Sequence, residues 1–315
     1  MMNALPAEDQ PAIRISGLNK TFVQGGFRSR RMVKALNDIN IEIGRGEIVA
    51  LVGESGSGKS TLARCIARLE QPDDGVMEVL GEDVLRTQRR RATKQYRRTV
   101  QMVFQDPFGS LNPTQRIEHV LARPLQLHGK VRGDLHSQLV DLVTSVGLPP
   151  EVLGSFPHEM SGGQRQRIAI ARVLAIEPEV ILADEPTSML DVSVRIGVLN
   201  LLARLRDERG IAILYVTHDL ASARYLADRI IVMHQGTLVE GGESLTLLDN
   251  PRHPYTQMLV GAVPDPDRTE IFDPVERARY RTEISRWAAA TSERVVVDAA
   301  NDHWVWMPTE EARQH

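Results

Sequence analysis

Residues 47–60 read Glu47-Ile-Val-Ala-Leu-Val52 and then Gly53-Glu-Ser-Gly-Ser-Gly-Lys-Ser60, and this stretch decides the fold. The apolar run is typical of a strand that is buried on both faces. The glycine-rich segment fits the phosphate-loop pattern Gly-x4-Gly-Lys-Ser, and residues Lys59 to Leu69 follow it with one apolar helix face. In such a loop several backbone N–H groups point at one anion, and the N-terminus of the helix adds positive potential. The stretch therefore predicts a nucleotide-phosphate site in an α/β protein.

Two side chains at the end of this loop have expected contacts with the nucleotide. Lys59 is expected to reach the β- and γ-phosphates, and the hydroxyl of Ser60 to be a ligand of Mg2+. A second apolar strand, Val180-Ile-Leu-Ala183, ends in the carboxylates of Asp184 and Glu185. We expect Asp184 to face the magnesium side of the phosphates and Glu185 to polarise the attacking water. Alone, such an acidic pair is as often a helix cap or an ion pair.

The ends of two further predicted strands carry polar side chains. His218 follows Tyr215-Val-Thr217, level with the two carboxylates, and we favour a contact with the γ-phosphate over a structural histidine. Gln105 follows Val100-Gln-Met-Val-Phe104, and its amide is placed to contact magnesium or water. Strands that alternate with helices in this way indicate a sheet with a parallel centre.

A second glycine-containing segment reads Met160-Ser-Gly-Gly-Gln164 and precedes a helix expected from Gln164 to Ala175. Ser161 is placed to cap this helix, and the two glycines leave backbone N–H groups free at its start. The segment predicts an anion site separate from the first, although an ordinary Ser-Gly-Gly turn has the same letters. Two phosphate-binding loops in one chain indicate a nucleotide that is shared between two copies.

The order of these motifs resembles that of ATP-binding-cassette (ABC) ATPases: the phosphate loop, Gln105, the segment 160–164, Asp184-Glu185, Ser188-Met-Leu-Asp191 and His218. The resemblance covers about residues 12–260 and implies one nucleotide-binding domain of an ABC importer. Its fold would be a P-loop NTPase with a parallel-centred RecA-like core, an antiparallel β subdomain and an α-helical subdomain at about residues 106–175. Two more strings resemble the dipeptide, oligopeptide and nickel importer ATPases: Phe104-Gln-Asp-Pro-Phe-Gly-Ser-Leu-Asn-Pro113 and Asn250-Pro-Arg-His-Pro-Tyr-Thr256.

The resemblance also implies roles for individual residues. The expected ATP contacts come from an adenine-stacking aromatic and the phosphate loop: Phe22, Gly53, Glu54, Ser55, Gly56, Ser57, Gly58, Lys59, Ser60 and Thr61. The signature residues expected to contact the ATP of the partner subunit are Ser161, Gly162, Gly163 and Gln164. The implied catalytic residues are Glu185, His218 and Gln105, the implied magnesium ligands are Ser60, Gln105 and Asp184, and Asp191 would couple the two subunits. Met160 replaces the usual Leu of the signature, which keeps the apolar volume.

The protein that this resemblance implies is an ATPase that uses ATP and Mg2+. It would work as a head-to-tail dimer with a second ABC ATPase subunit, in a hetero- or homodimer. It would lie on the cytoplasmic face of the cell membrane as a peripheral subunit, bound to two transmembrane permease subunits and through them to an extracytoplasmic solute-binding protein. Peptides or a related small solute are the implied cargo, and no nucleic acid is expected.

Composition limits the other function classes. The 315 residues include 38 Lys and Arg and 41 Asp and Glu, and the formal charge of −3 disfavours a dedicated nucleic-acid binder. The single cysteine, Cys65, excludes an internal disulfide and a multi-cysteine metal centre. Apolar runs such as Ile211-Ala-Ile-Leu-Tyr-Val216 are far shorter than the about 20 residues of a membrane span. Residues 1–10 lack the apolar core of a signal peptide.

Three other functions remain open from the sequence. The chain could be a soluble ABC ATPase of DNA repair or translation, which only the basic stretch 86–98 supports; a solvated helix face is the simpler interpretation of that stretch. It could instead be the ATPase of a soluble phosphonate-degrading complex. The third alternative is a non-catalytic regulatory module on the same fold, which the intact Glu185 and His218 disfavour.

The two ends differ from the central region. Residues 1–11 are expected to be a mobile leader, and residues 261–315 a C-terminal extension that contains all three tryptophans. Within it, Val295-Val-Val297 and Trp304-Val-Trp306 are expected to pair as a small β hairpin. Many peptide-type relatives carry a cysteine cluster in this region, and its absence here excludes such a metal cluster.

Overall fold

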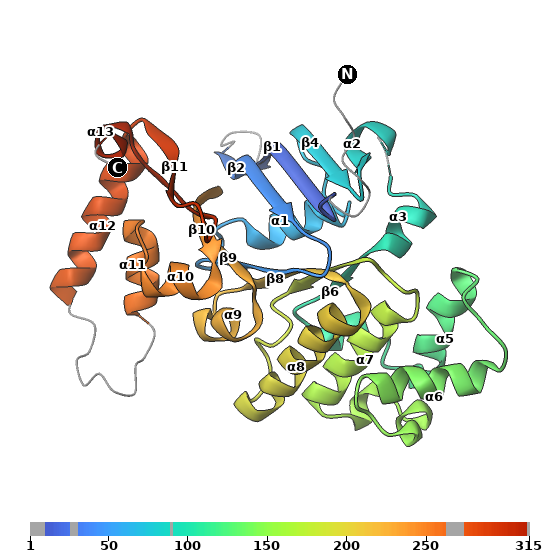
Figure 1. The fold of residues 1–315 in the computed structure, drawn as a ribbon. Helices are drawn as coiled ribbons and strands as arrows, with labels where there is room; N and C mark the ends of the chain where they lie inside the picture. The colour runs from blue at the N-terminus through green and yellow to red at the C-terminus, as the bar shows by residue number, and fades with distance from the viewer. Residues whose placement is uncertain (1–9, 26–30, 89–90, 263–273, 314–315) are drawn as a thin grey trace.

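A computed structural model describes residues 10–25, 31–88, 91–262 and 274–313, and its centre is an eight-stranded sheet (Figure 1). The strand order is β11-β12-β10-β9-β3-β8-β7-β6, with the strands from β9 to β6 parallel and the others antiparallel. The parallel centre predicted from the sequence is therefore confirmed. The parallel strands are β9 (Arg229–His234), β3 (Ile48–Val52), β8 (Ala212–Thr217), β7 (Val180–Asp184) and β6 (Val100–Val103).

A second, four-stranded antiparallel sheet lies over one face of this core. Its order is β2-β1-β4-β5. Residues of β1 and β2 share one apolar cluster with the first helix, α1, and with alternate residues of β3. The strands are β1 (Ile13–Gln24), β2 (Arg31–Ile43), β4 (Asp74–Val79) and β5 (Glu82–Asp83).

Helices surround the main sheet and form a separate helical region, drawn in green in Figure 1. That region contains α4 (Pro107–Ser110), α5 (Ile117–Leu127), α6 (Leu135–Ser145) and α7 (Gly162–Leu174). After it come α8 (Val192–Arg209), α9 (Leu220–Leu226), α10 (Ser244–Asp249) and α11 (Pro254–Gly261). Within the described residues, no helix combines the length and the apolar character needed to cross a membrane.

The strand β3 is buried on both faces, as its apolar run predicts. Ile48, Ala50 and Val52 belong to one core cluster, which contains α5 to α8 residues. Val49 and Leu51 belong to the other cluster, on the side of the antiparallel sheet. Successive side chains of a strand point to opposite faces, so one strand supplies both cores. This places the phosphate loop at the end of the most enclosed strand.

The first helix is shorter than the apolar pattern predicts. α1 covers Lys59–Ile66, and Arg68 has a φ of +58°, in the left-handed region. The Leu69 N–H then donates to the Arg64 carbonyl, closing the turn that ends the helix. Leu69 continues the apolar spacing of the helix in sequence, but it lies beyond the helix end and is 58% exposed.

The basic stretch 86–98 is not one helix. It is divided between α2 (Val84–Thr87) and α3 (Lys94–Thr99), and residues 89–90 lie outside the described part. The expected solvent exposure holds for its described basic side chains, which are Arg86, Arg91, Lys94, Arg97 and Arg98. Thr93 caps α3 by accepting from the Tyr96 N–H, and Tyr96 is buried, so packing of one aromatic fixes this short helix.

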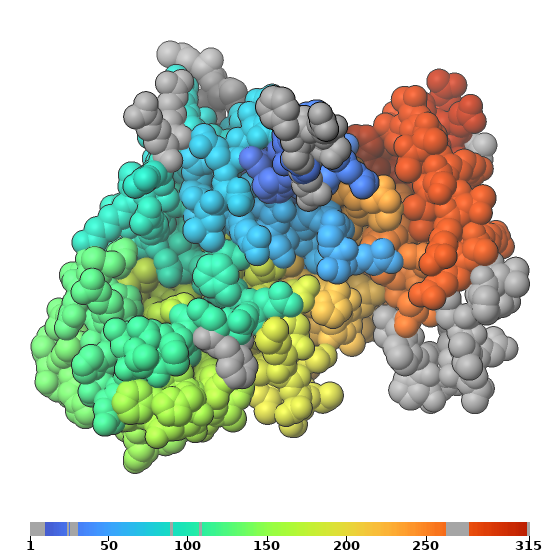
Figure 2. All heavy atoms as spheres, turned by 180° about the vertical axis from the view of Figure 1, so that it is seen from behind, coloured from blue at the N-terminus to red at the C-terminus, as the bar shows by residue number. Residues whose placement is uncertain are grey.

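The C-terminal tail continues the main sheet. β11 (Ser292–Asp298) and β12 (His303–Pro308) pair as an antiparallel hairpin, and β12 also pairs with β10 (Thr237–Glu243). Figure 2 shows the tail, in red, against the orange segment that contains β10. Between α11 and the hairpin lies α12 (Pro274–Ala289), and the short α13 (Thr309–Ala312) follows it. The expected leader, residues 1–11, lies outside the described part up to residue 9.

Close backbone approach explains why β10 accepts the hairpin. A Cβ on Gly241 would lie 2.6 Å from the ring of Trp304, which is 3% exposed. A Cβ on the next residue, Gly242, would lie 3.0 Å from the His303 Cα. Two successive glycines on β10 therefore make the space that β12 fills.

We predict that Gly241→Ala displaces the hairpin. The added methyl overlaps Trp304, and overpacking of this kind costs about 1–3 kcal/mol. Because all three tryptophans lie in the tail, the emission of intrinsic fluorescence should shift to longer wavelength. The control is Gly154→Ala, whose Cβ would have no neighbour closer than 3.9 Å. Identical emission from the two variants would contradict the prediction.

Candidate functional site

The segment between β3 and α1 forms a tight loop around a central space. Gly53, Gly56 and Gly58 have φ angles of +153°, +82° and +111°, which side chains disfavour. A Cβ at Gly53 would overlap the Met233 carbonyl oxygen, and one at Gly58 would overlap that of Ala35. A Cβ on Gly56 would meet nothing within 4 Å. The loop is therefore closed by backbone at both ends and open at its middle.

Lys59 holds this loop from inside. Its Nζ donates to the carbonyl oxygens of Gly53 and Glu54, at 2.7 Å each, and Lys59 is 4% exposed. Burial lowers the pKa of Lys59, while the carboxylates of Glu185, Asp184 and Glu54 act in the opposite direction. A buried positive charge inside the loop attracts an anion that enters the central space, because little water screens the interaction there. Of the other loop residues, Ser55 is exposed, Ser57 is buried and Thr61 is half-buried.

Ser60 and Asp184 meet across the two elements. The Ser60 hydroxyl donates to Asp184 Oδ1 at 2.8 Å, which joins the start of α1 to the end of β7. Burial raises the pKa of Asp184, and the hydrogen bond from Ser60 opposes this shift. A hydroxyl and a carboxylate are hard oxygen donors of the kind that Mg2+ prefers. The residues expected to bind magnesium therefore fit that ion, except that Gln105 contacts a different carboxylate.

Glu185 lies where three parallel strands end. Its carboxylate accepts from Gln105 Nε2 at 3.0 Å and lies 3.3 Å from His218 Nδ1. Its backbone has a φ of +46°, held by an N–H bond to the Val216 carbonyl at 2.9 Å. The Glu185 side chain is 15% exposed and that of His218 is 56% exposed. The three side chains expected to be catalytic are thus in direct contact, and the histidine faces open space.

The second glycine-containing segment begins α7. The Ser161 hydroxyl accepts from the Gln164 N–H at 3.3 Å, and Gln164 Oε1 accepts from the Ser161 N–H at 2.9 Å. This capping box uses the Gln164 side chain within the helix end. A Cβ on Gly163 would overlap Val194 of α8, so this glycine allows close helix packing, whereas Gly162 is only half-buried. The helix begins at Gly162, two residues before the predicted start.

Phe22 and Asp191 lie apart from the contacts described so far. Phe22 is on β1, half-buried, with Lys20 Nζ 5.2 Å from its ring centre. Asp191 precedes α8 as its N-cap residue, but its exposed side chain makes no capping hydrogen bond. Both positions leave the side chain accessible to a ligand or a second chain.

One contact of the loop is absent from the sequence analysis. The Glu54 N–H donates to the hydroxyl of Tyr255, a fully buried residue of α11, at 2.8 Å. Tyr255 lies 201 positions further along the chain, so no local pattern could connect it with the loop. In the sequence, Tyr255 stands out only as part of the string 250–256, to which no function of its own could be assigned.

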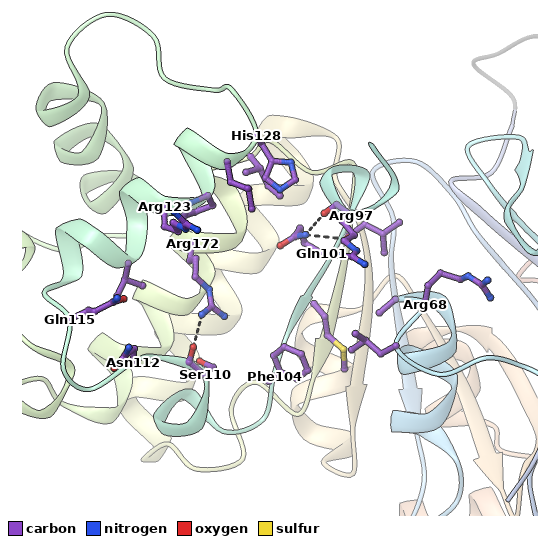
Figure 3. Close-up of a pocket in the computed structure, with 18 residues that line it drawn as sticks. Arg68, Arg97, Gln101, Phe104, Ser110, Asn112, Gln115, Arg123, His128 and Arg172 are labelled. Carbon is purple, nitrogen blue, oxygen red and sulfur yellow. Dashed lines mark hydrogen bonds between the residues drawn. The ribbon is translucent and has the colours of Figure 1, made fainter. Parts of the chain in front are cut away.

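A groove of about 680 Å3 lies beside Phe104, the residue before Gln105, and between the end of α1 with β6 and the helices α5 and α7 (Figure 3). Phe104 and Leu127 line it and are 38% and 55% exposed. Four arginines line it as well: Arg68, Arg97, Arg123 and Arg172. The groove therefore combines apolar contact area with positive charge.

The comparisons with known proteins agree with this geometry. Residues 36–188 match the family described as ABC transporter, and residues 239–283 match the one described as oligopeptide/dipeptide transporter, C-terminal region. The chain is 41% identical to the oligopeptide transport ATP-binding protein OppF of Streptococcus mutans, over 84% of this chain and 87% of the relative. It is 42% identical to the dipeptide transport ATP-binding protein DppF of Escherichia coli, over 87% and 82%.

Solved structures show the same fold. A dimeric ATP-binding cassette in a post-hydrolysis state with ADP and phosphate superposes with a TM-score of 0.63 and 29% identity, over 74% of this chain and 98% of that one. Sequence and structure thus agree over most of the chain, and the chain belongs to the family of ABC transporter ATP-binding proteins.

Proposed function

We propose that this chain is the ATP-hydrolysing subunit of an ABC importer for peptides or a related small solute. The observation that carries the proposal is the meeting of the phosphate loop, the Ser60–Asp184 pair and the Glu185 cluster at one edge of the sheet. The peptide assignment is supported by the names of the relatives, which are oligopeptide and dipeptide transport ATP-binding proteins. Those names disfavour the soluble complexes considered from the sequence.

The residues divide the work of hydrolysis between them. Lys59 and the N–H groups of the loop bind the phosphates, and Phe22 stacks on the adenine. Ser60 and Asp184 would hold Mg2+, with Gln105 as the further candidate ligand, and the ion would neutralise charge on the phosphates. Glu185 accepts a hydrogen bond from the attacking water and orients it toward the γ-phosphorus. Gln105 and His218 hold the Glu185 carboxylate in place, and His218 reaches the γ-phosphate from its exposed side.

The site is completed by a second ABC ATPase subunit, in a hetero- or homodimer. Ser161, Gly162, Gly163 and Gln164 begin α7 and would face the ATP held by the partner, with Asp191 linking the two subunits. The backbone donors to that ATP would be the N–H groups of Gly162 and Gly163, because the capping box uses those of Ser161 and Gln164. Binding of ATP closes this head-to-tail dimer. Loss of the γ-phosphate removes the contacts that join the two faces, so hydrolysis opens it.

The groove beside Phe104 is the proposed contact with the membrane subunits. A short helix with apolar and acidic side chains would match its exposed Phe104 and Leu127 and its arginines. Phe104 lines the groove and directly precedes Gln105, which donates to Glu185. Movement of the bound helix would therefore be transmitted through Gln105 to the Glu185 carboxylate. The subunit would thus lie on the cytoplasmic face of the membrane, bound to two permease subunits and indirectly to an extracytoplasmic solute-binding protein, with no nucleic-acid partner.

Glu185→Gln tests the catalytic assignment. Because the amide cannot accept a proton from water, phosphate release should fall by at least about 100-fold. The affinity for ATP should stay within about twofold, since Lys59 and the loop are unchanged. Both are measured on the purified complex by phosphate release and by ATP titration. Glu208→Gln, an exposed carboxylate of α8, is the matched control. Normal turnover of Glu185→Gln would remove Glu185 from the mechanism.

Arg123→Glu tests the groove. Reversal of a charge that lines it should repel an acidic partner helix and lower the recovery of membrane proteins by about tenfold, a loss of about 1.4 kcal/mol in binding. Recovery is measured by affinity purification from detergent-solubilised cells with mass spectrometry. Arg281→Glu, an exposed position on α12, is the control. Equal recovery with the two variants, or recovery of soluble enzymes alone, would contradict the assigned contact.

A further inference from the structure

The phosphate loop is also held from outside, through a single peptide unit. The N–H of Glu54 donates to the Tyr255 hydroxyl at 2.8 Å, and the carbonyl of Gly53, which belongs to the same peptide, accepts from Lys59 Nζ at 2.7 Å. A peptide unit is planar, so the orientation of its N–H fixes that of its carbonyl. Tyr255 therefore determines where Lys59 finds one of its two carbonyl acceptors.

Tyr255 itself has a fixed position. Its side chain is fully buried, and its ring centre lies 4.1 Å from that of His234 at the end of β9. Burial raises the pKa of Tyr255 to about 12, so the phenol stays neutral at physiological pH. Its backbone N–H donates to His253 Nδ1 at 3.1 Å. Burial lowers the pKa of His253 to about 3, which leaves the ring uncharged and able to accept this bond.

The turn before Tyr255 is held by a buried carboxylate. Glu240 of β10 is fully buried, and its two oxygens accept from the N–H groups of Arg252 and His253 at 2.7 and 3.0 Å. These bonds fix the two residues that precede α11 to the main sheet. A buried carboxylate is costly unless its oxygens are satisfied, so this arrangement depends on all of its partners.

The third partner of Glu240 comes from the tail. His303 Nε2, on β12, lies 2.8 Å from Glu240 Oε1, and His303 is 1% exposed. Trp287 of α12 adds an edge-on contact with the ring of His253 at 5.0 Å. The C-terminal tail thus reaches the turn that carries Tyr255 in two ways, directly through the ring of Trp287 and indirectly through the contact of His303 with Glu240.

We propose that Tyr255 is a positioning residue for the phosphate loop, and that the C-terminal hairpin sets its position through His303, Glu240 and His253. We call these four residues the loop brace. Without the Tyr255 hydroxyl the Gly53–Glu54 peptide loses its outer partner, and its carbonyl no longer holds Lys59 in one place. Affinity for ATP then falls although the fold persists. The inference rests on the proposed function only in taking ATP as the ligand of this loop.

The first experiment compares two hydroxyl deletions in the full-length chain. Tyr255→Phe removes the contact to the loop. The control, Tyr225→Phe, removes the hydroxyl of an exposed tyrosine that donates to Asn200 Oδ1 at 2.6 Å on α8. ATP affinity is measured by calorimetric titration, and thermal unfolding is recorded for each protein without nucleotide. Tyr255→Phe should bind ATP about fivefold more weakly, the effect of one net hydrogen bond, and the control should match the wild type.

The second experiment tests the part played by the tail. Coupling between two sites is reciprocal, so ATP should slow hydrogen exchange at the amides of residues 303–307 in the wild type. In Tyr255→Phe, with ATP at saturating concentration, this protection should be largely lost. His303→Asn should weaken ATP binding as well. If both residues act through one path, the losses should not add, and the affinity of the double variant should equal that of the weaker-binding single variant within about twofold.

The outcomes separate the inference from the function on which it rests. If Tyr255→Phe binds ATP as the wild type does, or if its lost affinity is matched by an equal loss of thermal stability, Tyr255 only packs, and the inference is wrong. Additive losses in Tyr255→Phe and His303→Asn, or exchange at β12 unaffected by ATP, overturn the role of the hairpin. A wild type that fails to bind ATP at all overturns the proposed function together with the inference.

Discussion

The parallel pairing of β3, β8 and β7 is the constraint on which the rest of the structure depends. Its register sets Val52 beside Thr217 and Asp184 beside Val216. The carboxyl ends of parallel strands meet at one edge, so the segments that follow them converge there. A slip of one residue would turn every side chain to the other face. Since both faces of these strands are apolar and enclosed, the packing that stabilises the core also fixes the geometry of the site.

Electrostatics then prepares that edge for an anion. Lys59 brings a positive charge into a nearly dry loop, where carbonyl oxygens and nearby carboxylates offset its desolvation. Asp184 is buried in the same place, and its hydrogen bond from Ser60 opposes the rise in its pKa. Burial of either charge alone would destabilise the fold, and the nearby opposite charge reduces that cost for both Lys59 and Asp184. A phosphate chain with a divalent cation would add charges of both signs where their partners already lie.

The tail changes what the sheet is. Without β11 and β12, β10 would be an exposed edge with two glycines on it. With them, β10 is paired on both sides and β11 becomes the edge strand, and Glu240 gains a partner from the C-terminal tail. Because Glu240 also holds the turn that carries Tyr255, the end of the chain is connected with the first peptide of the phosphate loop.

The local chemistry could be read from the sequence. The glycines at 53, 56 and 58, the acidic pair and the cap at Ser161 depend on backbone geometry within a few residues, and short-range patterns record such geometry. The alternation of strands with helices also indicated the parallel centre, and the apolar runs indicated strands buried on both faces. Helix ends were less accurate: α1 stops at Ile66 because Arg68 adopts a left-handed conformation, which apolar spacing does not reveal.

Contacts across the chain were decided by the tertiary structure alone. The pattern of the tail indicated a hairpin, but not that β12 would join β10, since any edge strand offers the same row of N–H and C=O groups. The sequence predicted that Gln105 contacts magnesium or water, and it did not reveal that Gln105 donates to Glu185 or that the Glu54 N–H donates to the Tyr255 hydroxyl. A hydrogen bond between residues 201 positions apart leaves no periodic trace in a sequence, so only the packed fold can determine it.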